Sequence, residues 1–189
     1  MASSDRLSFL LAFLRDRKAV GSITPSSAAL SRAMGRRANI RHHANVAELG
    51  AGTGPVTRAI LDQLPPTGRL WSFEINPDFV TRLRSRFVDP RLTIVPRSAE
   101  TLADLAREVG IVGFDAVVSA IPFRMLGRDA STRLIGRVSE GMAPGAPFVA
   151  VQYSPFYLRP IVQDVFGNWD RSYFLWNIPP ATIFRAEKR

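Results

Sequence analysis

From residue 46 to the C-terminus, short apolar runs alternate with segments whose apolar residues follow helical spacing. Seven of the apolar runs have the length and residue types of β-strands: 45–50, 69–75, 91–99, 114–123, 148–154, 171–178 and 181–188. Helices are expected between them, at 55–64, 77–87, 100–109 and about 129–141. Because parallel neighbours need a crossover connection, this alternation predicts a doubly wound α/β fold, in which a mostly parallel seven-stranded sheet carries helices on both faces.

Length and composition limit the number of domains and the kinds of site. The 189 residues fit one domain of ordinary size, and 46% hydrophobic with 22% charged residues is typical of a globular protein. The chain has no cysteine, which excludes disulfides and thiolate metal sites. Its two histidines, His42 and His43, are adjacent in a polar stretch with no carboxylate at ligand spacing, so no metal site is expected.

Net charge distinguishes the first 45 residues from the rest. They contain eight Arg and Lys residues and two Asp residues, and so hold six of the nine net positive charges of the chain. A basic segment of this kind indicates an anionic partner, such as a membrane surface or a nucleic acid. We therefore divide the chain into an N-terminal helical arm and lid, 1–45, and a main domain, 46–189.

The arm contains an apolar run, 7–14, whose leucines fall on one helical stripe that phenylalanines widen. Eight residues are too few to span a bilayer, which takes about 20. Two interpretations stand: a helix that covers the domain core, or an amphipathic helix in the membrane interface with cations that meet anionic lipid. The residues expected at a membrane are Leu7, Phe9, Leu10, Phe13, Leu14, Arg15, Arg17 and Lys18.

A glycine-rich turn, 48–54 (ELGAGTG), follows the first expected strand. Glycines at alternate positions allow a tight turn and let a ligand approach the backbone. The next strand ends at Glu74, 20 residues after Gly54, which is the distance at which a carboxylate accepts hydrogen bonds from a ribose. The glycine spacing here is G-x-G-x-G, whereas the pyrophosphate fingerprint is G-x-G-x-x-G. We therefore expect a ligand with a ribose and no pyrophosphate in this loop.

These motifs resemble those of the S-adenosylmethionine-dependent methyltransferases with a Rossmann-like fold, over about residues 45–153. The glycine turn is similar to their first motif, Glu74 to their ribose-binding acid, and RSAE, 97–100, to the segment at the adenine. Glu48 faces the cationic cofactor in one interpretation and only satisfies nearby donors in another. The resemblance implies S-adenosylmethionine as cofactor, bound by Glu48, Gly50, Gly52, Thr53, Gly54, Glu74, Ile75, Ser98, Ala99, Glu100 and Ser119.

The segment SAIPF, 119–123, ends the fourth expected strand. It resembles the loop of methyltransferases that modify exocyclic base amines, but Ser119 replaces their Asn or Asp. We expect Ile121, Pro122 and Phe123 at the reacting amine, together with Tyr153 after the fifth strand. The proton acceptor stays open between water, a backbone carbonyl of this loop and a tyrosine.

The segment 19–34, of which 19–27 is expected to close over the cofactor, and the short length make nearly the whole chain similar to the bacterial phospholipid N-methyltransferases. That family methylates phosphatidylethanolamine stepwise toward phosphatidylcholine, which implies a phospholipid substrate and a protein bound peripherally to the cytoplasmic face of the inner membrane. DNA is not expected as a partner. The alternatives are an RNA or protein methyltransferase and a catalytically silent cofactor-binding protein. Expected substrate contacts are Thr24, Ser26, Arg124 and Tyr157.

Aromatic residues near the fourth and fifth strands are candidates for a cage around the methylated ammonium. They are Phe123, Tyr153, Phe156 and Tyr157. The competing interpretation is that these rings belong to the core. For the lipid phosphate, the local cations are Arg124, Arg128 and Arg159. Farther along the chain, Trp169, Phe174 and Trp176 are expected to pack inside the domain.

Overall fold

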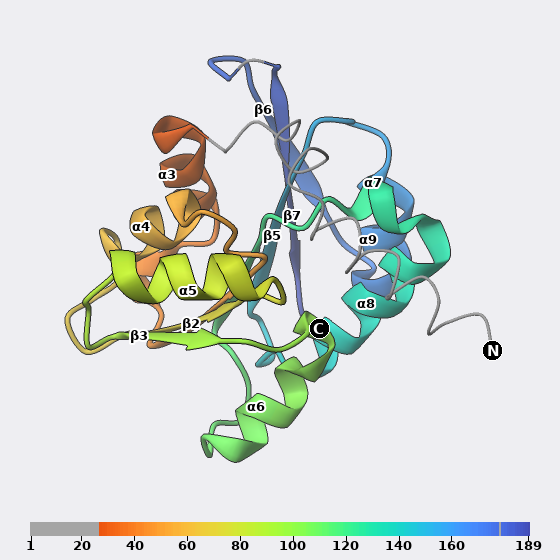
Figure 1. Cartoon of the computed structure of the whole chain (residues 1–189). Helices are drawn as coiled ribbons and strands as arrows, with labels where there is room; N and C mark the ends of the chain where they lie inside the picture. Colours follow the sequence, from red (N-terminus) through yellow and green to blue (C-terminus); the bar gives the residue numbers. More distant parts are fainter. Residues whose placement is uncertain (1–26, 178) are drawn as a thin grey trace.

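The computed structural model describes residues 27–177 and 179–189. The expected helix at 7–14 and the substrate residues Thr24 and Ser26 lie outside these ranges. The described chain forms three layers, with a twisted sheet between two groups of helices (Figure 1).

All seven expected strands form one sheet, in the order β3-β2-β1-β4-β5-β7-β6. The first five strands pair in parallel, and β7 is antiparallel to both β5 and β6. The prediction of a doubly wound, mostly parallel seven-stranded sheet is therefore confirmed. The strands are β1 Asn45–Leu49, β2 Arg69–Phe73, β3 Leu92–Val95, β4 Ala116–Ser119, β5 Pro147–Gln152, β6 Asp170–Phe174 and β7 Ala181–Glu187.

The helices divide between the two faces of the sheet. One face carries α3, α4 and α5, and the other carries α6, α8 and α9. The α-helices are α3 Ala28–Arg37, α4 Pro55–Leu61, α5 Pro77–Arg86, α6 Leu102–Glu108, α7 Phe123–Leu126, α8 Arg128–Glu140 and α9 Leu158–Phe166. Two short 3-10 helices are η1 Ile40–His42 and η2 Ala99–Thr101.

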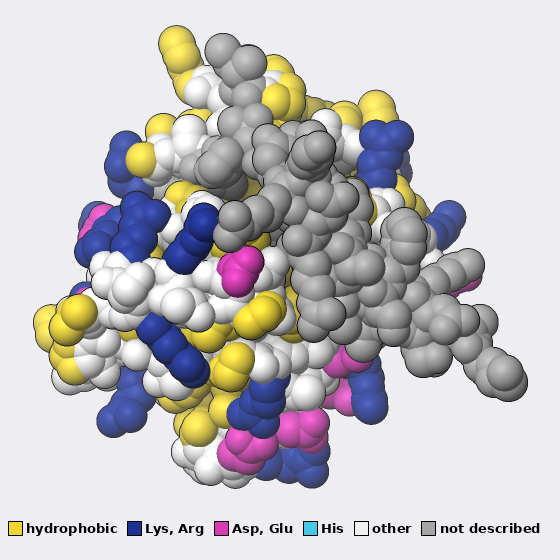
Figure 2. Space-filling model, viewed as in Figure 1, with side chains coloured by type: hydrophobic (Ala, Val, Ile, Leu, Met, Phe, Trp, Pro, Cys, Tyr) yellow, Lys and Arg dark blue, Asp and Glu magenta, His cyan; other side chains and the backbone are white. Residues whose placement is uncertain are grey.

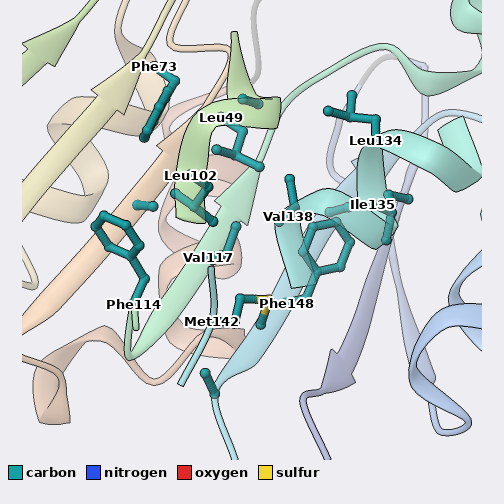
Figure 3. Packing of buried hydrophobic residues seen from close by; sticks show 14 of the residues in the cluster. Leu49, Phe73, Leu102, Phe114, Val117, Leu134, Ile135, Val138, Met142 and Phe148 are labelled. Carbon is teal, nitrogen blue, oxygen red and sulfur yellow. The ribbon is translucent and has the colours of Figure 1, made fainter. Parts of the chain in front are cut away.

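Each face of the sheet has its own apolar cluster because the central strands are buried on both sides. In β1, Leu49 belongs to the cluster under α6, α8 and α9, whereas Val46 belongs to the cluster under α3, α4 and α5. Figure 3 shows the first cluster, where Leu102 of α6 and Ile135 of α8 meet side chains of the strands. Such two-sided burial explains why the strand sequences are nearly continuous apolar runs.

Three elements differ from the expectation: α7, which begins at Phe123 in the run expected as a strand, α9 and β6. Helix α9 was not predicted, although its apolar residues recur at helical spacing, and Pro160 lies in its first turn, where the missing N–H is tolerated. The strand expected at 171–178 ends at Phe174, and the chain turns at Leu175 and Trp176 before β7.

The start of the described chain lies beside the β6–β7 connection. Ser27 caps α3 by accepting a hydrogen bond from the Leu30 amide on its hydroxyl, at 3.2 Å. The Ser27 amide donates to Oδ1 of the buried Asn177 at 3.4 Å. Helix α3 then packs Leu30 and Met34 into the core. Helix α3 falls within the predicted arm, 1–45, but its side chains pack in the core of the domain. The boundary between arm and domain at residue 45 therefore stays a prediction.

Candidate functional site

Three of the sequence motifs meet at the carboxyl edge of the parallel strands. The amides of Gly50 and Ala51 donate to the Phe73 carbonyl of β2, at 2.9 and 3.1 Å. The Ala120 amide donates to the Leu49 carbonyl of β1, at 2.9 Å. The glycine turn, the end of β2 and the SAIPF loop are therefore held together by backbone bonds, at the edge where open α/β sheets bind ligands.

The three glycines of the turn all have positive φ angles, at 77°, 54° and 88° for Gly50, Gly52 and Gly54. A Cβ at Gly54 would lie 2.5 Å from the Phe87 ring, and one at Gly50 would lie 3.1 Å from Cγ1 of Ile121. A Cβ at Gly52 would meet no atom within 4 Å. Gly54 and Gly50 are thus required by protein packing, whereas Gly52 borders open space that a ligand can use.

Glu74 lies at the end of β2 and faces the turn, as predicted for a ribose acceptor. Its Oε2 accepts the Gly52 amide at 2.8 Å, and its Oε1 accepts the Asn76 amide at 2.8 Å. Burial raises the pKa of this carboxyl, while the backbone hydrogen bonds act in the opposite direction. Each oxygen of a carboxylate has two acceptor positions, so Glu74 retains capacity for ligand hydroxyls.

Glu48 is completely buried beneath the turn. Its Oε2 accepts hydrogen bonds from the hydroxyls of Thr57 on α4, at 2.7 Å, and Ser72 on β2, at 2.6 Å. Its Oε1 has no hydrogen-bond partner among the described residues. Desolvation raises the pKa of Glu48 to about 7. The contacts match the interpretation in which Glu48 satisfies nearby donors, which are the hydroxyls of Thr57 and Ser72 together with the backbone amide of Thr57.

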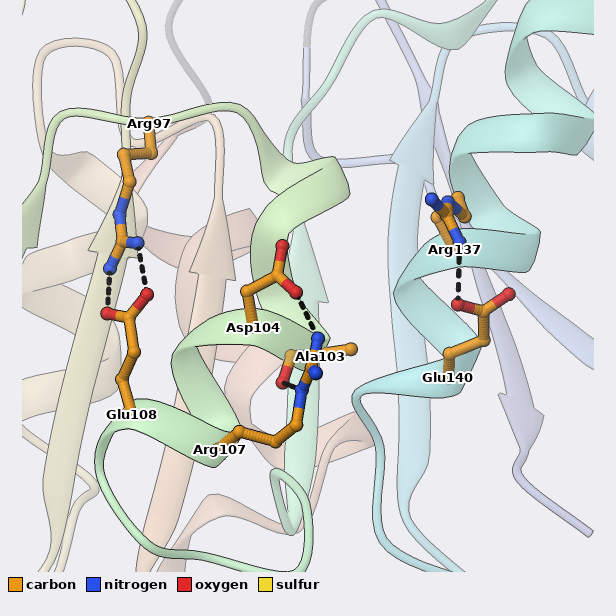
Figure 4. Close-up of polar contacts among 7 residues, drawn as sticks. All are labelled: Arg97, Ala103, Asp104, Arg107, Glu108, Arg137 and Glu140. Atoms are coloured by element: carbon orange, nitrogen blue, oxygen red, sulfur yellow. Dashed lines mark hydrogen bonds and ion pairs between the residues drawn. The ribbon is translucent and has the colours of Figure 1, made fainter.

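The segment expected at an adenine, Ser98 to Glu100, is fixed from both sides. The Ser98 hydroxyl accepts the Glu100 amide at 3.3 Å and begins η2, while Ala99 is buried and Glu100 is exposed. The preceding Arg97 forms two parallel hydrogen bonds of 2.8 Å with Glu108 of α6 (Figure 4). Such a forked pair fixes orientation as well as distance, so it holds the end of β3 against α6.

The SAIPF loop is held by residues from β5, α8 and α9. Gln152 donates from Nε2 to the Ile121 carbonyl at 3.0 Å, and the Tyr157 hydroxyl donates to the Phe123 carbonyl at 3.2 Å. The Ser131 hydroxyl lies 2.8 Å from the same Phe123 carbonyl. Two carbonyls of the loop thus already have protein donors, which leaves water and a tyrosine as the better candidates for the proton acceptor.

The four aromatic residues considered for a cage have different surroundings. Phe123 is 1% exposed and belongs to the core cluster, so the competing interpretation holds for this ring. Tyr157 packs against the same cluster and directs its hydroxyl to the loop. Tyr153 and Phe156 are 40% and 71% exposed. A cage of all four rings is not present in this arrangement, because two of them pack in the interior.

The other predicted residues lie at the same edge. Thr53 and Arg124 are exposed, Ile75 and Pro122 are half-buried, and Ser119 is buried at the end of β4. Among the residues that the structure describes, no three His, Asp or Glu side chains are placed to hold a metal ion.

Sequence reasoning missed Gln152 and the hydroxyl pair of Thr57 and Ser72. Gln152 directly precedes Tyr153 in an otherwise apolar strand, and a polar residue there was a usable signal. Thr57 and Ser72 are nine and 24 residues from Glu48. The parallel pairing of β1 with β2 places Ser72 opposite Glu48, and Thr57 reaches the carboxylate from α4.

Comparisons with known proteins identify the family to which the chain belongs. No protein-family profile matches the chain. An ornithine lipid N-methyltransferase of Singulisphaera acidiphila is 31% identical over 177 residues, which cover 93% of this chain and 92% of the relative. The solved O-methyltransferase of Bacillus cereus, in complex with S-adenosylhomocysteine, has a TM-score of 0.71 at 12% identity, over 95% of this chain and 90% of that one. The 16S rRNA N2 G1207 methyltransferase of T. thermophilus, in complex with S-adenosylmethionine and guanosine, has a TM-score of 0.63 at 21% identity, over 88% and 44%.

The residues at the carboxyl edge fit S-adenosylmethionine, the cofactor that this fold and relationship indicate. The space beside Gly52 gives the ligand access to the turn, and Glu74 has acceptor positions for ribose hydroxyls. With a relative above 30% identity over nearly its full length, the predicted mostly parallel seven-stranded sheet and these motifs in place, the chain belongs to the class I S-adenosylmethionine-dependent methyltransferases.

Proposed function

We propose that this methyltransferase acts on the amine nitrogen of a membrane lipid, and that phosphatidylethanolamine, methylated stepwise toward phosphatidylcholine, is its substrate. The observation that carries the proposal is the match to an ornithine lipid N-methyltransferase over nearly the full length of both chains. The resemblance of segment 19–34 and the overall length to phospholipid N-methyltransferases supports the choice of head group.

The chemistry requires positioning more than it requires a strong base. When bound, S-adenosylmethionine supplies a methyl carbon that the amine lone pair attacks while the carbon–sulfur bond breaks, leaving S-adenosylhomocysteine. The protein must therefore hold a neutral amine in line with the breaking bond. Partial desolvation next to a positive charge lowers the pKa of the lipid ammonium and favours the neutral form. After transfer, the product ammonium loses a proton to solvent or to a tyrosine before a further round.

The SAIPF loop suits this positioning role. Gln152 and Tyr157 fix it from two directions, and Ile121 lies next to Gly50 of the cofactor turn. A loop restrained in this way keeps the distance between amine and methyl donor constant. This matters because a small shift of the reacting atoms in a methyl transfer lowers the rate by a large factor.

Ornithine lipid is the second candidate substrate, because the relative carries that name and also belongs to the lipid N-methyltransferases. RNA is a third possibility, supported by the net charge of +9. The rRNA methyltransferase neighbour shares the fold at 21% identity and adds no evidence about substrate.

One labelling experiment separates these substrates. The protein is incubated with methyl-labelled cofactor, anionic vesicles that contain phosphatidylethanolamine and ornithine lipid, and total RNA, after which lipid and RNA fractions are counted. We expect the label on phosphatidylethanolamine. Label on ornithine lipid alone would replace the head group in the proposal, and label on RNA or on nothing would overturn it. Gly52→Val is the control, since its side chain would occupy the space beside the turn.

We also propose that the segment 7–18 attaches the enzyme to the cytoplasmic face of the inner membrane. None of the described helices is long and apolar enough to cross a bilayer. Replacement of Phe9 and Phe13 by serine is expected to weaken flotation with anionic vesicles, increasingly so as salt is raised. If the segment instead covers the core, the variant will show a lower melting temperature and unchanged affinity for vesicles.

A further inference from the structure

Among the residues that the structure describes, the large exposed apolar side chains form two groups, one at each edge of the sheet. Val88, Val109 and Val112 lie at the amino edge, in connections that precede β3 and β4. The other group lies at the carboxyl edge with the cofactor turn and consists of Met125, Tyr153, Phe156, Tyr173, Leu175 and Trp176. The amino-edge group contains only single aliphatic residues, whereas the carboxyl-edge group is mostly aromatic.

Four members of the second group form a patch on and beside the β6–β7 hairpin, which we call the hairpin patch. Phe156, Tyr173, Leu175 and Trp176 are 71%, 56%, 71% and 89% exposed. The pairing of Gln152 with Thr182 and of Phe174 with Ala181 places the hairpin tip at the carboxyl edge. Figure 1 shows the hairpin projecting at the top of the molecule, and Figure 2, in the same view, shows hydrophobic side chains at that end.

The patch is held in place by specific contacts. Arg171 of β6 donates from Nη1 to the Pro155 carbonyl at 2.8 Å, and its guanidinium lies 5.8 Å from the Phe156 ring and 5.2 Å from the Tyr173 ring. Arg171 thereby joins the loop after β5 to the hairpin. At the other end, buried Asn177 donates to the Pro179 carbonyl at 2.9 Å and accepts the Ser27 amide. The exposed Leu175 and Trp176 are thus presented by an anchored turn.

The residue types of the patch match the membrane interface. Trp and Tyr are the side chains enriched at head-group depth, where an apolar ring and a polar group are both satisfied. Arg171 and the exposed Arg159, which lies over Trp169, supply positive charge next to the apolar surface. Apolar tip and neighbouring cations together have the composition that binds anionic bilayers.

We propose that the hairpin patch inserts into the interface of an anionic bilayer and sets the carboxyl edge of the sheet against the membrane. This inference rests on the proposed lipid substrate, since it explains how a head group in the bilayer meets the cofactor turn without leaving the lipid layer. It is independent of the segment 7–18, because the residues that carry it lie on β6, the β6–β7 turn, the loop after β5 and, for Arg159, helix α9.

The main test compares two double variants on vesicles of phosphatidylglycerol and phosphatidylethanolamine. Leu175→Ser with Trp176→Ser removes the tip, and Val88→Ser with Val112→Ser removes equally exposed apolar residues from the opposite edge. The tip variant is expected to bind vesicles about tenfold or more weakly and to lose vesicle turnover in proportion, while the control binds as the wild type does. Turnover of a short-chain phosphatidylethanolamine below its critical micelle concentration should be the same in all three proteins.

Tryptophan fluorescence gives a direct measure of insertion. Vesicle binding should shift the emission to shorter wavelength, and lipids brominated near the head group should quench it. Both changes should be lost in Trp176→Phe, because Trp71 is buried and Trp169 is packed against the core.

The outcomes separate this inference from the proposed function. Equal vesicle affinity of the tip variant and the wild type would overturn the inference even if lipid is methylated normally. Vesicle binding that depends on the tip, without methylation of any lipid, would overturn the proposed function and leave the inference standing. A wild type that is dimeric without lipid, with a monomeric tip variant, would show that the patch contacts a second copy of the chain instead.

Discussion

The two halves of the sheet contribute to the site in different ways. In the half built from β1, β2 and β3, the functional groups are backbone amides, glycine conformations and two buried carboxylates, Glu48 and Glu74. In the half built from β4 to β7, they are exposed aromatic rings and a loop held by side chains from three elements.

This difference corresponds to the two ligands that we assign to the halves, the cofactor to the first and the proposed lipid to the second. A cofactor of fixed shape is bound by fixed backbone geometry, which tolerates little change of sequence. The lipid substrate that we propose would arrive in a bilayer, and a surface that meets it needs composition and exposure more than exact positions. We therefore expect substitutions in the first half to affect stability and cofactor affinity, and those in the second half to affect substrate use.

The largest effect is expected at the glycine turn. Gly54→Ala combines a left-handed φ, which costs about 1–2 kcal/mol for an L-residue, with a contact 2.5 Å from Phe87, which adds about 1–3 kcal/mol. Chemical denaturation should show that summed loss of stability. Gly52→Ala is the matched variant, with the same backbone strain and no clash, and should lose about 1–2 kcal/mol of stability while weakening cofactor binding in calorimetry. Equal stability of the two variants would contradict the packing role of Gly54.

Next in size is the pH dependence caused by Glu48. Because the pKa of this carboxyl is raised to about 7 in the folded protein, its contribution to stability is fully present below about pH 4.5 and is lost as pH rises to about 7. Glu48→Gln keeps an acceptor for Thr57 and Ser72 and cannot ionise. Relative to this variant, the wild type should lose on the order of 3 kcal/mol between these pH values in urea titrations. Parallel stability curves of the two proteins would show that Glu48 is not the titrating group.

A smaller effect is expected for Glu74→Gln. The Gly52 and Asn76 amides are bound by different oxygens of the carboxylate, and in glutamine one of these oxygens becomes an NH2 donor, so one of the two contacts is lost. Loss of a charged acceptor should weaken cofactor binding by about 1.5–3 kcal/mol, or roughly 10- to 150-fold by calorimetry. Asp62→Asn, a change at an exposed carboxylate that follows α4, is the comparison. An unchanged dissociation constant in folded Glu74→Gln would remove Glu74 from the cofactor site.

The smallest effect is expected in the second half, for Tyr157→Phe. This change removes one hydrogen bond to the Phe123 carbonyl, which Ser131 also contacts, so stability should fall by about 0.5–1.5 kcal/mol. Cofactor affinity should not change, while turnover of lipid should fall several-fold because the SAIPF loop is less restrained. A reduced cofactor affinity with normal turnover would reverse the roles assigned to the two halves.

The sequence allowed good prediction of the first half and weaker prediction of the second. The positions of the strands, the turn at Gly50 to Gly54 and the position of Glu74 follow from local patterns, because glycine and the acid act where they stand in the chain, whereas the order of the strands was not predicted. Trp176 was expected to pack inside and is 89% exposed. This prediction failed because the apolar residues after β6 resemble a continued strand in sequence, although the chain turns there. Phe123 is the opposite case: its ring was a candidate for the aromatic cage, and it is buried at the start of α7, a helix that the sequence did not predict.

The Ser27–Asn177 hydrogen bond has a consequence for folding during synthesis. Its two residues are 150 positions apart, which at about 5–20 residues per second corresponds to roughly 8–30 s of translation. Helix α3 is made at the start of that interval, whereas β5, which it contacts, and β7, which shares its apolar cluster, are made only near or after its end. The nascent chain therefore carries an uncovered apolar helix face until its last strands leave the ribosome, and chaperones or the membrane surface have that time to engage it before the domain closes.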